Sequence, residues 1–284
     1  DLLEEIGVDS GKLPELVDYN ETFPLTEDGA KLLGVTPGTP VLLSNPDGAM
    51  NQTGSGGLKS GVMTVSVGTS SALRMSVANA VLPEEPHTWC YLSPKGYLAG
   101  AAISGGCSSI EWFREKIAQN APYEQLECRE DVDTPVFLPF LYGERCPGEN
   151  EERSGGFYGL KPYHDRRSMY QAVQEGVLFN LRQGYEELCR ICGEPQGIRL
   201  SGGILHSPEW SQMCADIFER EISIEENPQC SLQGGVVLAM DVLGCCPAEA
   251  FEAETKGIIV PLAEHTGHYR EKYQRYLEIY RSAQ

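Results

Sequence analysis

Apolar and polar residues alternate along two neighbouring segments in the first third of the chain. Residues 62–67 (VMTVSV) and 72–77 (ALRMSV) both show this two-residue period, and the short polar segment 68–71 (GTSS) separates them. A two-residue period is typical of strands that bury one face, so the pattern predicts a β-hairpin with a polar tip. Residues 91–104 predict a second hairpin, which turns at a Pro-Lys-Gly sequence.

A different spacing, with apolar residues three and four positions apart, predicts the helices. It is most regular over residues 168–192, where the expected core-facing stripe consists of Met169, Ala172, Val173, Val177, Leu178 and Leu181. A stripe at helical spacing packs against a core more often than it binds a ligand. Shorter helices are predicted over residues 108–120, 208–218, 234–243 and 263–284, and short strands over residues 40–43, 198–200 and 221–224. This alternation of strands with helices indicates an α/β fold.

One long segment shows no regular period. Residues 133–160 are rich in proline and glycine, and their length predicts a functional or lobe-bridging loop. Within this loop, Glu144 and Arg145 are expected to form a structural ion pair. In another part of the chain, the predicted strand 221–224 is expected to lie at a sheet edge. Three side chains of the predicted helix 108–120 are expected to face the core: Trp112, Phe113 and Ile117.

The composition is that of a globular protein with a strong negative charge. Of 284 residues, 41% are hydrophobic, which is enough for one large domain or two smaller ones. The net charge of -19 argues against nucleic acid or an anionic membrane as a partner, because both require a basic surface. No apolar run approaches the ~18 residues of a membrane span, and the acidic start DLLEEIG lacks the features of a signal peptide, so a cytoplasmic location is predicted.

The cysteines and histidines show no metal-ligand spacing. Cys189 and Cys192 form the one CxxC sequence, and they lie within a predicted helix without a second pair or a histidine pair to complete a zinc site. We therefore predict reduced, structural thiols and no protein-held metal site. A nucleotide remains compatible with the negative charge if backbone N–H groups, helix N-termini and a divalent cation hold its phosphates.

Asp47 stands at a predicted corner between a strand and a helix. It lies in the turn 45–48 (NPDG), which follows the apolar run 40–43 and opens a small-residue helix. A carboxylate in this position is stabilised by the helix dipole and can accept a proton from a substrate hydroxyl. The simpler interpretation is a helix N-cap without catalytic function.

Two glycine-containing turns are candidate phosphate or nucleotide contacts. The hairpin tip 68–71 offers N–H and hydroxyl donors, and Ser201-Gly202-Gly203 follows a strand and precedes a helix, where glycine lets a ligand approach the backbone. Small polar residues at turns also occur without any ligand. The second turn is not GxGxxG and lacks an acidic ribose partner, which argues against a dinucleotide site, and the chain contains no Walker A sequence.

Eight sequence blocks in a fixed order resemble the C-terminal portion of the FGGY family of carbohydrate kinases. They are PDGAMNQTGSG, SVGTSSAL, ISGGCSSIEWF, LPFLYGERCP, RSGGFYGL, AVQEGVLFNL, SGGILHSPEWSQMCADIF and SLQGGVVLA, and they cover the chain from about residue 24 onward. The resemblance implies an actin-like, RNase H-like ATPase fold of two lobes. Residues 1–60 would be the end of the N-terminal, sugar-binding lobe, and residues 61–284 the C-terminal, ATP-binding lobe. About half of a kinase, including the rest of the N-terminal lobe, is expected to be absent.

The resemblance also implies roles for single residues. Asp47 matches the catalytic base that takes the proton of the sugar hydroxyl as the hydroxyl attacks the γ-phosphate. The other matched positions are implied to bind ATP: Ser66, Gly68, Thr69, Ser70, Gly106, Gly202, Gly203 and Ser207. ATP and Mg²⁺ are the implied cofactors. The chain departs from the family at residues 204–207 (ILHS), where Ala and Asn are common, which leaves the contacts to adenine open.

Within the family, several features resemble gluconate kinases. They are the Asp47-Gly48 pair, the GTSSALR turn and the FNLRQ sequence of the long helix. The predicted reaction is therefore the ATP-dependent phosphorylation of D-gluconate to 6-phosphogluconate, with xylulose, ribulose or glycerol as alternative substrates. A second hypothesis is a non-catalytic half-kinase that binds nucleotide, or that needs a homodimer or a partner subunit to complete the cleft. A chaperone- or phosphatase-like actin relative is a third.

Overall fold

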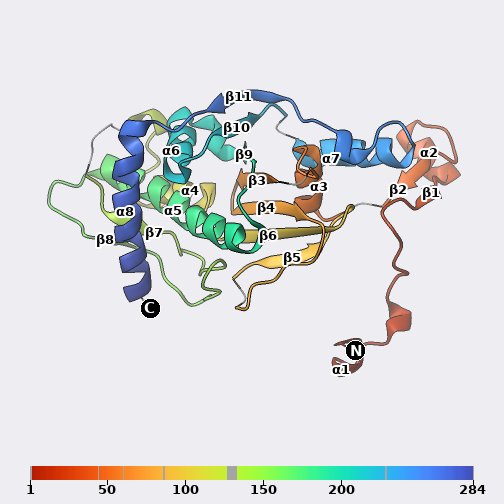
Figure 1. Ribbon diagram of the computed structural model, residues 1–284, viewed down its shortest axis with the longest axis horizontal. Helices are drawn as coiled ribbons and strands as arrows, with labels where there is room; N and C mark the ends of the chain where they lie inside the picture. The colour runs from red at the N-terminus through yellow and green to blue at the C-terminus, as the bar shows by residue number, and fades with distance from the viewer. Residues whose placement is uncertain are drawn as a thin grey trace.

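A mixed β-sheet forms the centre of the molecule (Figure 1). The computed structural model describes residues 2–43, 45–59, 61–85, 87–126, 133–227 and 229–283. The sheet has seven strands in the order β11-β10-β9-β3-β4-β6-β5, of which β3, β9 and β10 are parallel to one another. Their bounds are β3 Val62–Val67, β4 Ser71–Val77, β5 Trp89–Leu92, β6 Tyr97–Ile103, β9 Gly197–Gly202, β10 Ile222–Glu225 and β11 Thr255–Ile259.

One face of this sheet carries the main hydrophobic core. The alternating apolar residues of the β3–β4 hairpin and of β6 point to this face and are buried there beneath α5 (Arg166–Cys192). Gly184 lets α5 approach closely, because a Cβ at this position would lie 3.1 Å from both Leu73 Cδ1 and Ala101 Cβ. Three further helices complete this layer: α4 (Cys107–Lys116), α6 (Pro208–Phe218) and α8 (Ala263–Ser282).

The opposite face carries a smaller and more polar layer. Helix α3 (Asp47–Gly54) lies there and packs against α7 (Cys230–Val242). On this face, Thr64 of β3 donates a 2.6 Å hydrogen bond to Gln52 of α3. The two helices meet at backbone distance, because a Cβ on Gly54 would lie 1.9 Å from the Cys230 carbonyl oxygen and one on Gly234 would lie 2.1 Å from the Met50 carbonyl oxygen.

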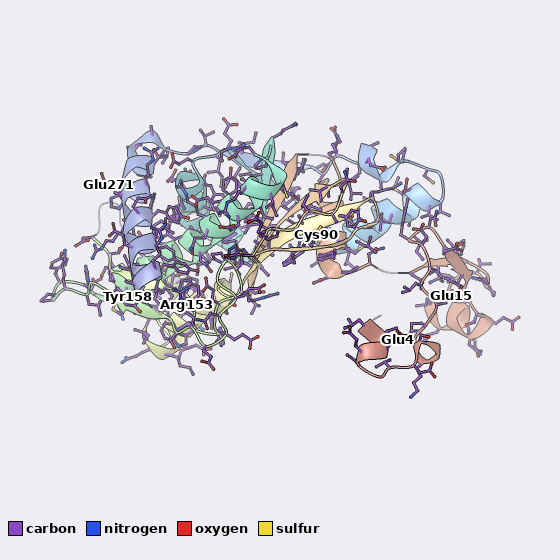
Figure 2. The ribbon with its side chains drawn as sticks, turned by 60° about the horizontal axis from the view of Figure 1, so that its bottom comes forward. Glu4, Glu15, Cys90, Arg153, Tyr158 and Glu271 are labelled. Carbon is purple, nitrogen blue, oxygen red and sulfur yellow. The ribbon has the colours of Figure 1, made fainter. Side chains whose placement is uncertain are left out.

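Residues 2–43 lie beside α7 and extend away from the sheet (Figures 1 and 2). This part contains α1 (Leu2–Glu5), α2 (Glu27–Leu33) and a two-stranded sheet of β1 (Thr22–Pro24) and β2 (Pro40–Leu42). Figure 2 shows Glu4 and Glu15 on this segment, apart from the body that carries Cys90 and Arg153. Many apolar side chains of the segment are exposed, among them Leu2, Leu13, Leu16, Leu32, Leu33 and Val35.

The α/β class, both hairpins and the helix 208–218 are confirmed, and the predicted stripe of the long helix lies in the core, with Met169 partly buried at its margin. The strand predicted at 221–224 is not at the edge, because β11 pairs with its outer side. Ile117 is exposed, since α4 ends at Lys116 and the chain turns through left-handed conformations at Gln119 and Asn120.

The loop 133–160 contains structure that its composition does not predict. Two short strands, β7 (Val136–Leu138) and β8 (Gly156–Tyr158), pair within it. The predicted ion pair between Glu144 and Arg145 is wrong: the buried Glu144 carboxylate pairs instead with Arg153, 2.7 Å away, and accepts a hydrogen bond from Tyr280 of α8. Burial of Glu144 favours the more enclosed arginine as its partner, and Arg145 stays at the surface. In the described part of the chain, no helix is long and apolar enough to cross a membrane.

Because α3 and α7 are in close contact, two adjacent glycines of α7 should respond differently to substitution by alanine. We expect Gly234→Ala to destabilise the fold by about 1–3 kcal/mol or more, because the new methyl group would collide with the α3 backbone. At Gly235 a Cβ would meet only Met50 Cε, at 3.5 Å, so Gly235→Ala should stabilise the helix by roughly 0.5–1 kcal/mol. Urea unfolding of both variants measures the difference. Equal effects of the two substitutions would contradict this packing.

A buried carboxyl group at the end of β10 makes stability depend on pH. Burial raises the pKa of Glu225 from 4.5 to about 7, Arg199 acts in the opposite direction, and Oε1 of Glu225 has no hydrogen-bond partner. The folded state therefore keeps a proton that the unfolded state releases between pH 4.5 and 7, so stability decreases as the pH rises through this window.

We expect Glu225→Gln to remove this dependence. The unfolding free energy of the variant minus that of the unmodified chain should increase by on the order of 2–3 kcal/mol from pH 5 to pH 8. Denaturant unfolding at the two pH values measures the gain. The exposed Glu226 offers a matched control as Glu226→Gln, and an equal pH slope in all three proteins would show that Glu225 is ionised at little cost.

Candidate functional site

The tip of the β3–β4 hairpin is held against the start of α4. The backbone N–H groups of Cys107 and Ser108 donate to the carbonyl oxygens of Gly68 (2.7 Å) and Thr69 (3.2 Å). Gly106 makes this approach possible, because a Cβ there would lie 2.5 Å from the Gly68 oxygen and 2.9 Å from the Thr69 oxygen. The tip is thus fixed from behind by its carbonyl groups, while Thr69 and Ser70 stay exposed.

The end of β9 meets the end of β3 at the same place. Gly202 pairs with Val67 in the parallel ladder and has a φ of +97°, and a Cβ there would lie 2.5 Å from the Val67 carbonyl oxygen. Gly203 faces Cys107, whose sulfur would lie 2.7 Å from an added Cβ. The structure therefore brings together the two glycine turns that the sequence singles out, around the carboxyl end of β3.

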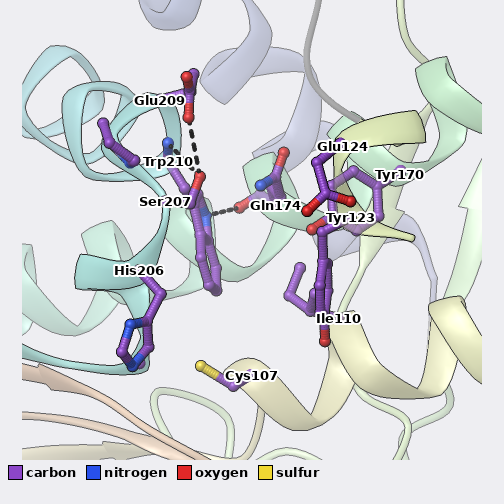
Figure 3. Close-up of a pocket in the computed structure, with 12 residues that line it drawn as sticks. Cys107, Ile110, Tyr123, Glu124, Tyr170, Gln174, His206, Ser207, Glu209 and Trp210 are labelled. Atoms are coloured by element: carbon purple, nitrogen blue, oxygen red, sulfur yellow. Dashed lines mark hydrogen bonds between the residues drawn. The ribbon is translucent and has the colours of Figure 1, made fainter.

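A cavity of about 640 Å³ opens beside these glycines (Figure 3). Gly203, His206 and Ser207 contribute one side, from the turn between β9 and α6. Ile110, Tyr123, Tyr170 and Gln174 contribute the other side, from α4, α5 and the segment that follows α4. The cavity is large enough for a ligand with a flat ring, and its lining is mostly apolar and aromatic, as is typical of small-molecule sites.

Ser207 and Trp210 show how this cavity is built. Ser207 lies at its wall, and its hydroxyl caps α6 by accepting a 3.2 Å hydrogen bond from the N–H of Trp210. The Trp210 indole donates to the Gln174 carbonyl oxygen at 3.2 Å, which ties α6 to α5 (Figure 3). Sequence reasoning did not find these residues. Trp210 and Gln174 lie within predicted helices, Tyr123 lies in a short turn after the predicted helix 108–120, and no motif marks any of them as a ligand contact.

Asp47 occupies the first helical position of α3, on the other face of the sheet. Pro46 is the N-cap of this helix, so Asp47 is not the cap that the simpler interpretation requires. Its side chain is exposed, and Oδ1 accepts a hydrogen bond from the adjacent Gly48 N–H at 2.7 Å. This arrangement leaves carboxylate acceptor capacity directed toward solvent at a helix N-terminus.

An arginine and a tyrosine pack against Gly48, directly beside Asp47. A Cβ on Gly48 would lie 2.7 Å from the Tyr91 hydroxyl oxygen and 2.9 Å from Arg74 Nε. Burial lowers the pKa of Arg74, and the nearby Tyr91 and Asp47 oppose this effect. Burial raises the pKa of Tyr91, so its phenol stays neutral. Arg74 also donates to the Ser66 hydroxyl at 3.1 Å, which places Ser66 on the Asp47 side of β3.

The hairpin tip lies between three cavities. Gly203 and Cys107 line the largest one; Thr69 lines a second, of about 370 Å³, with Trp112 and Tyr142. Ser70 lines a third, of about 310 Å³, on the side of Arg74. The predicted residues thus form two groups that the tip connects. Asp47 and Ser66 lie on one side, and the side of the 640 Å³ cavity carries Gly106, Gly202, Gly203 and Ser207.

The oxygen ligands near the tip suit a cation that is held mainly by phosphate. Mg²⁺ usually keeps several waters and binds through one or two carboxylates together with substrate phosphates. Asp47 offers one such exposed carboxylate. Across the described ranges, no three His, Cys, Asp or Glu side chains gather into a metal-binding group.

Comparison with known proteins identifies the class. Residues 63–241 match the model for the C-terminal domain of the FGGY family of carbohydrate kinases. The gluconokinase of Bacillus subtilis is 30% identical over 256 residues, which cover 84% of this chain and 50% of that protein. The chain belongs to the FGGY family of carbohydrate kinases, and it spans about half the length of the gluconokinases that it matches.

Two solved structures agree with this assignment. The ligand-bound xylulose kinase from Lactobacillus acidophilus superposes with a TM-score of 0.91 at 27% identity, covering 99% of this chain and 59% of that one. The gluconate kinase from the same organism gives a TM-score of 0.86 at 27% identity, with the same coverage. These likenesses confirm the expected family, its actin-like fold and the match to the C-terminal portion. They do not separate a gluconate kinase from a xylulose kinase.

Proposed function

We propose that this chain carries the ATP site and the catalytic base of a kinase that phosphorylates a hydroxyl group of a sugar or sugar acid. The observation that carries the proposal is the position of the hairpin tip 68–70 between the 640 Å³ cavity and the face that carries Asp47. A nucleotide base in the large cavity would direct its phosphates across the tip toward the face on which Asp47 lies. The acceptor hydroxyl would then sit beside the Asp47 carboxylate.

The chain's own residues supply positioning and charge compensation. Exposed Thr69 and Ser70 offer backbone N–H and hydroxyl donors to phosphate oxygens, since α4 already occupies the carbonyl groups of Gly68 and Thr69. Asp47 would accept the proton of the acceptor hydroxyl as that oxygen attacks the terminal phosphorus and ADP leaves. Mg²⁺, when bound to the phosphates, would neutralise part of their negative charge.

Ser66 and Ser207 take part less directly in this proposal. Ser66 accepts a hydrogen bond from Arg74 and lies within β3, two residues before Gly68, so it would fix Arg74 more than it would contact phosphate. Ser207 would shape the wall near the base while capping α6. The proposed division remains residues 1–60 for the end of the sugar-binding lobe and residues 61–284 for the ATP-binding lobe.

D-gluconate is the substrate that we propose first, with 6-phosphogluconate as product. This choice of substrate rests on the Asp47-Gly48 pair, on Arg74 within the GTSSALR turn and on the likeness to a gluconokinase at 30% identity. Xylulose is the second candidate because a xylulose kinase gives the TM-score of 0.91.

A half-kinase that requires a second lobe or subunit is the alternative function. Exposed apolar side chains favour it, since large bare apolar patches are uncommon on proteins that act alone. They gather on the N-terminal segment and on the neighbouring α7, where Leu232, Val236, Met240 and Leu243 are exposed. In that case the chain would bind nucleotide, and phosphoryl transfer would need the partner that completes the acceptor side.

We expect Asp47→Asn to lower sugar-dependent ADP release from Mg·ATP by about 10²- to 10⁴-fold, while the affinity for ADP without Mg²⁺ stays unchanged. The substitution removes the proton acceptor and keeps the side-chain shape. Asp28→Asn is a matched control, because Asp28 is an exposed aspartate in the first turn of α2. The assay offers gluconate, xylulose, ribulose and glycerol separately.

Three results are informative. Release with one sugar that disappears only in Asp47→Asn supports the kinase and names its substrate. Undiminished release in Asp47→Asn would show that Asp47 is not the base. Nucleotide binding without release for any sugar would favour the half-kinase.

A further inference from the structure

The third cavity described above, which Ser70 lines, lies on the Asp47 side of the sheet and is lined by basic side chains. It has a volume of about 310 Å³, and its lining includes Arg74, Arg145, Trp89, Tyr91 and Ser70. Two arginines therefore line it, and its lining contains no acidic residue, in a chain whose net charge is -19. A concentration of positive charge in one concave site of an acidic protein points to an anionic ligand.

Arg74 is held in place without an anionic partner in contact. Its Nη1 donates to the Ser66 hydroxyl at 3.1 Å, and its buried Nε has no hydrogen-bond partner. In the part of the chain that the structure describes, it forms no ion pair; the Tyr91 phenol and, at longer range, Asp47 are the groups that favour its charged form. A half-buried guanidinium without a carboxylate partner forms strong hydrogen bonds with a ligand that supplies two oxygen acceptors, because such bonds are charge-assisted and bidentate.

Arg145 contributes the second charge, from the loop 133–160. Its neighbour Glu144 is occupied by Arg153 and Tyr280, so the loop 133–160 holds Glu144 inward and leaves Arg145 at the cavity. Arg145 is exposed and forms no ion pair with any of the described residues. The side chain is therefore positioned by the structure of its loop and remains available to a ligand.

The position of the cavity relates it to the acceptor and not to the nucleotide base. Arg74 and Tyr91 pack against Gly48, the residue after Asp47, whereas the 640 Å³ cavity lies beside α4, α5 and α6 on the other face of the sheet. The Trp89 and Tyr91 rings are stacked, with centroids 4.6 Å apart, and give the cavity an aromatic wall. A water molecule occupies about 30 Å³ in the liquid, so the cavity has room for far more than one oxyanion.

We propose that this cavity binds the acceptor and that Arg74 and Arg145 recognise a carboxylate on it, which makes the substrate an aldonic acid. The inference deepens the proposed function and rests on it. The Arg74 guanidinium would receive the carboxylate oxygens, Arg145 would add a second positive charge, and the aromatic wall would contact the carbon chain. Both arginines are specificity-determining residues, and the chemical step remains with Asp47.

Calorimetric titration of the full chain, in the presence of ADP and Mg²⁺, tests the assignment. The probes are gluconate, the uncharged polyol sorbitol, and inorganic phosphate. We expect gluconate to bind, sorbitol to bind at least about tenfold more weakly, and both Arg74→Lys and Arg145→Gln to weaken gluconate by about tenfold or more. Arg145→Gln is the variant least able to disturb folding, because Arg145 is exposed. Arg190→Gln, an exposed arginine of α5, is the control and should bind gluconate normally.

The outcomes separate this inference from the proposed function. Equal affinity of all variants for gluconate, or no gluconate binding by a chain that binds ADP, would overturn the carboxylate site and leave the nucleotide site standing. Phosphate that binds more tightly than gluconate, and depends on the same two arginines, would assign the cavity to the transferred phosphoryl group instead. Failure to bind ADP would count against the proposed function itself, and Arg-dependent gluconate binding would still support the carboxylate site.

Discussion

The whole site depends on one close approach of backbones at the carboxyl end of β3. The hairpin tip, the start of α4 and the end of β9 meet there at distances that leave no room for a Cβ at Gly106 or Gly202. Because α4 donates its first N–H groups to the tip carbonyls, the tip keeps one conformation and presents its exposed residues outward. A phosphate chain that crosses this tip would meet a surface that needs little rearrangement, which is the physical basis of electrostatic preorganisation.

The sheet divides the chemistry between its two faces. The apolar face supports α5 and, through α6, the wall of the 640 Å³ cavity, so this cavity is built on the main hydrophobic core. The polar face supports α3, whose first residue is Asp47. Gly54 and Gly234 set the position of α3 against α7, and Gly48 admits Arg74 and Tyr91 beside the carboxylate. Small residues thus determine where the charged groups lie.

The sequence predicted the elements whose apolar spacing is local and regular. The period of two in residues 62–77 and the period near 3.6 in residues 168–192 gave the hairpin and the long helix, because burial of one face imposes each period. β11 was not predicted because its apolar run is short, residues 258–260 (IIV), and the strand is mostly exposed along the sheet edge. Glu144 was paired with its sequence neighbour, although a buried carboxylate takes the partner that tertiary packing supplies. Arg74 and Trp210 were not predicted as site residues for the same reason: only the fold brings them to their cavities.

The most direct test of this account is a crystal structure of the chain with Mg·ADP. The account predicts adenine in the cavity between Tyr123 and the start of α6, and the β-phosphate at the backbone N–H groups of Thr69 and Ser70, on the path toward Asp47. Adenine bound elsewhere, or a diphosphate that points away from the hairpin tip, would contradict the central claim that the tip connects the nucleotide to the catalytic carboxylate.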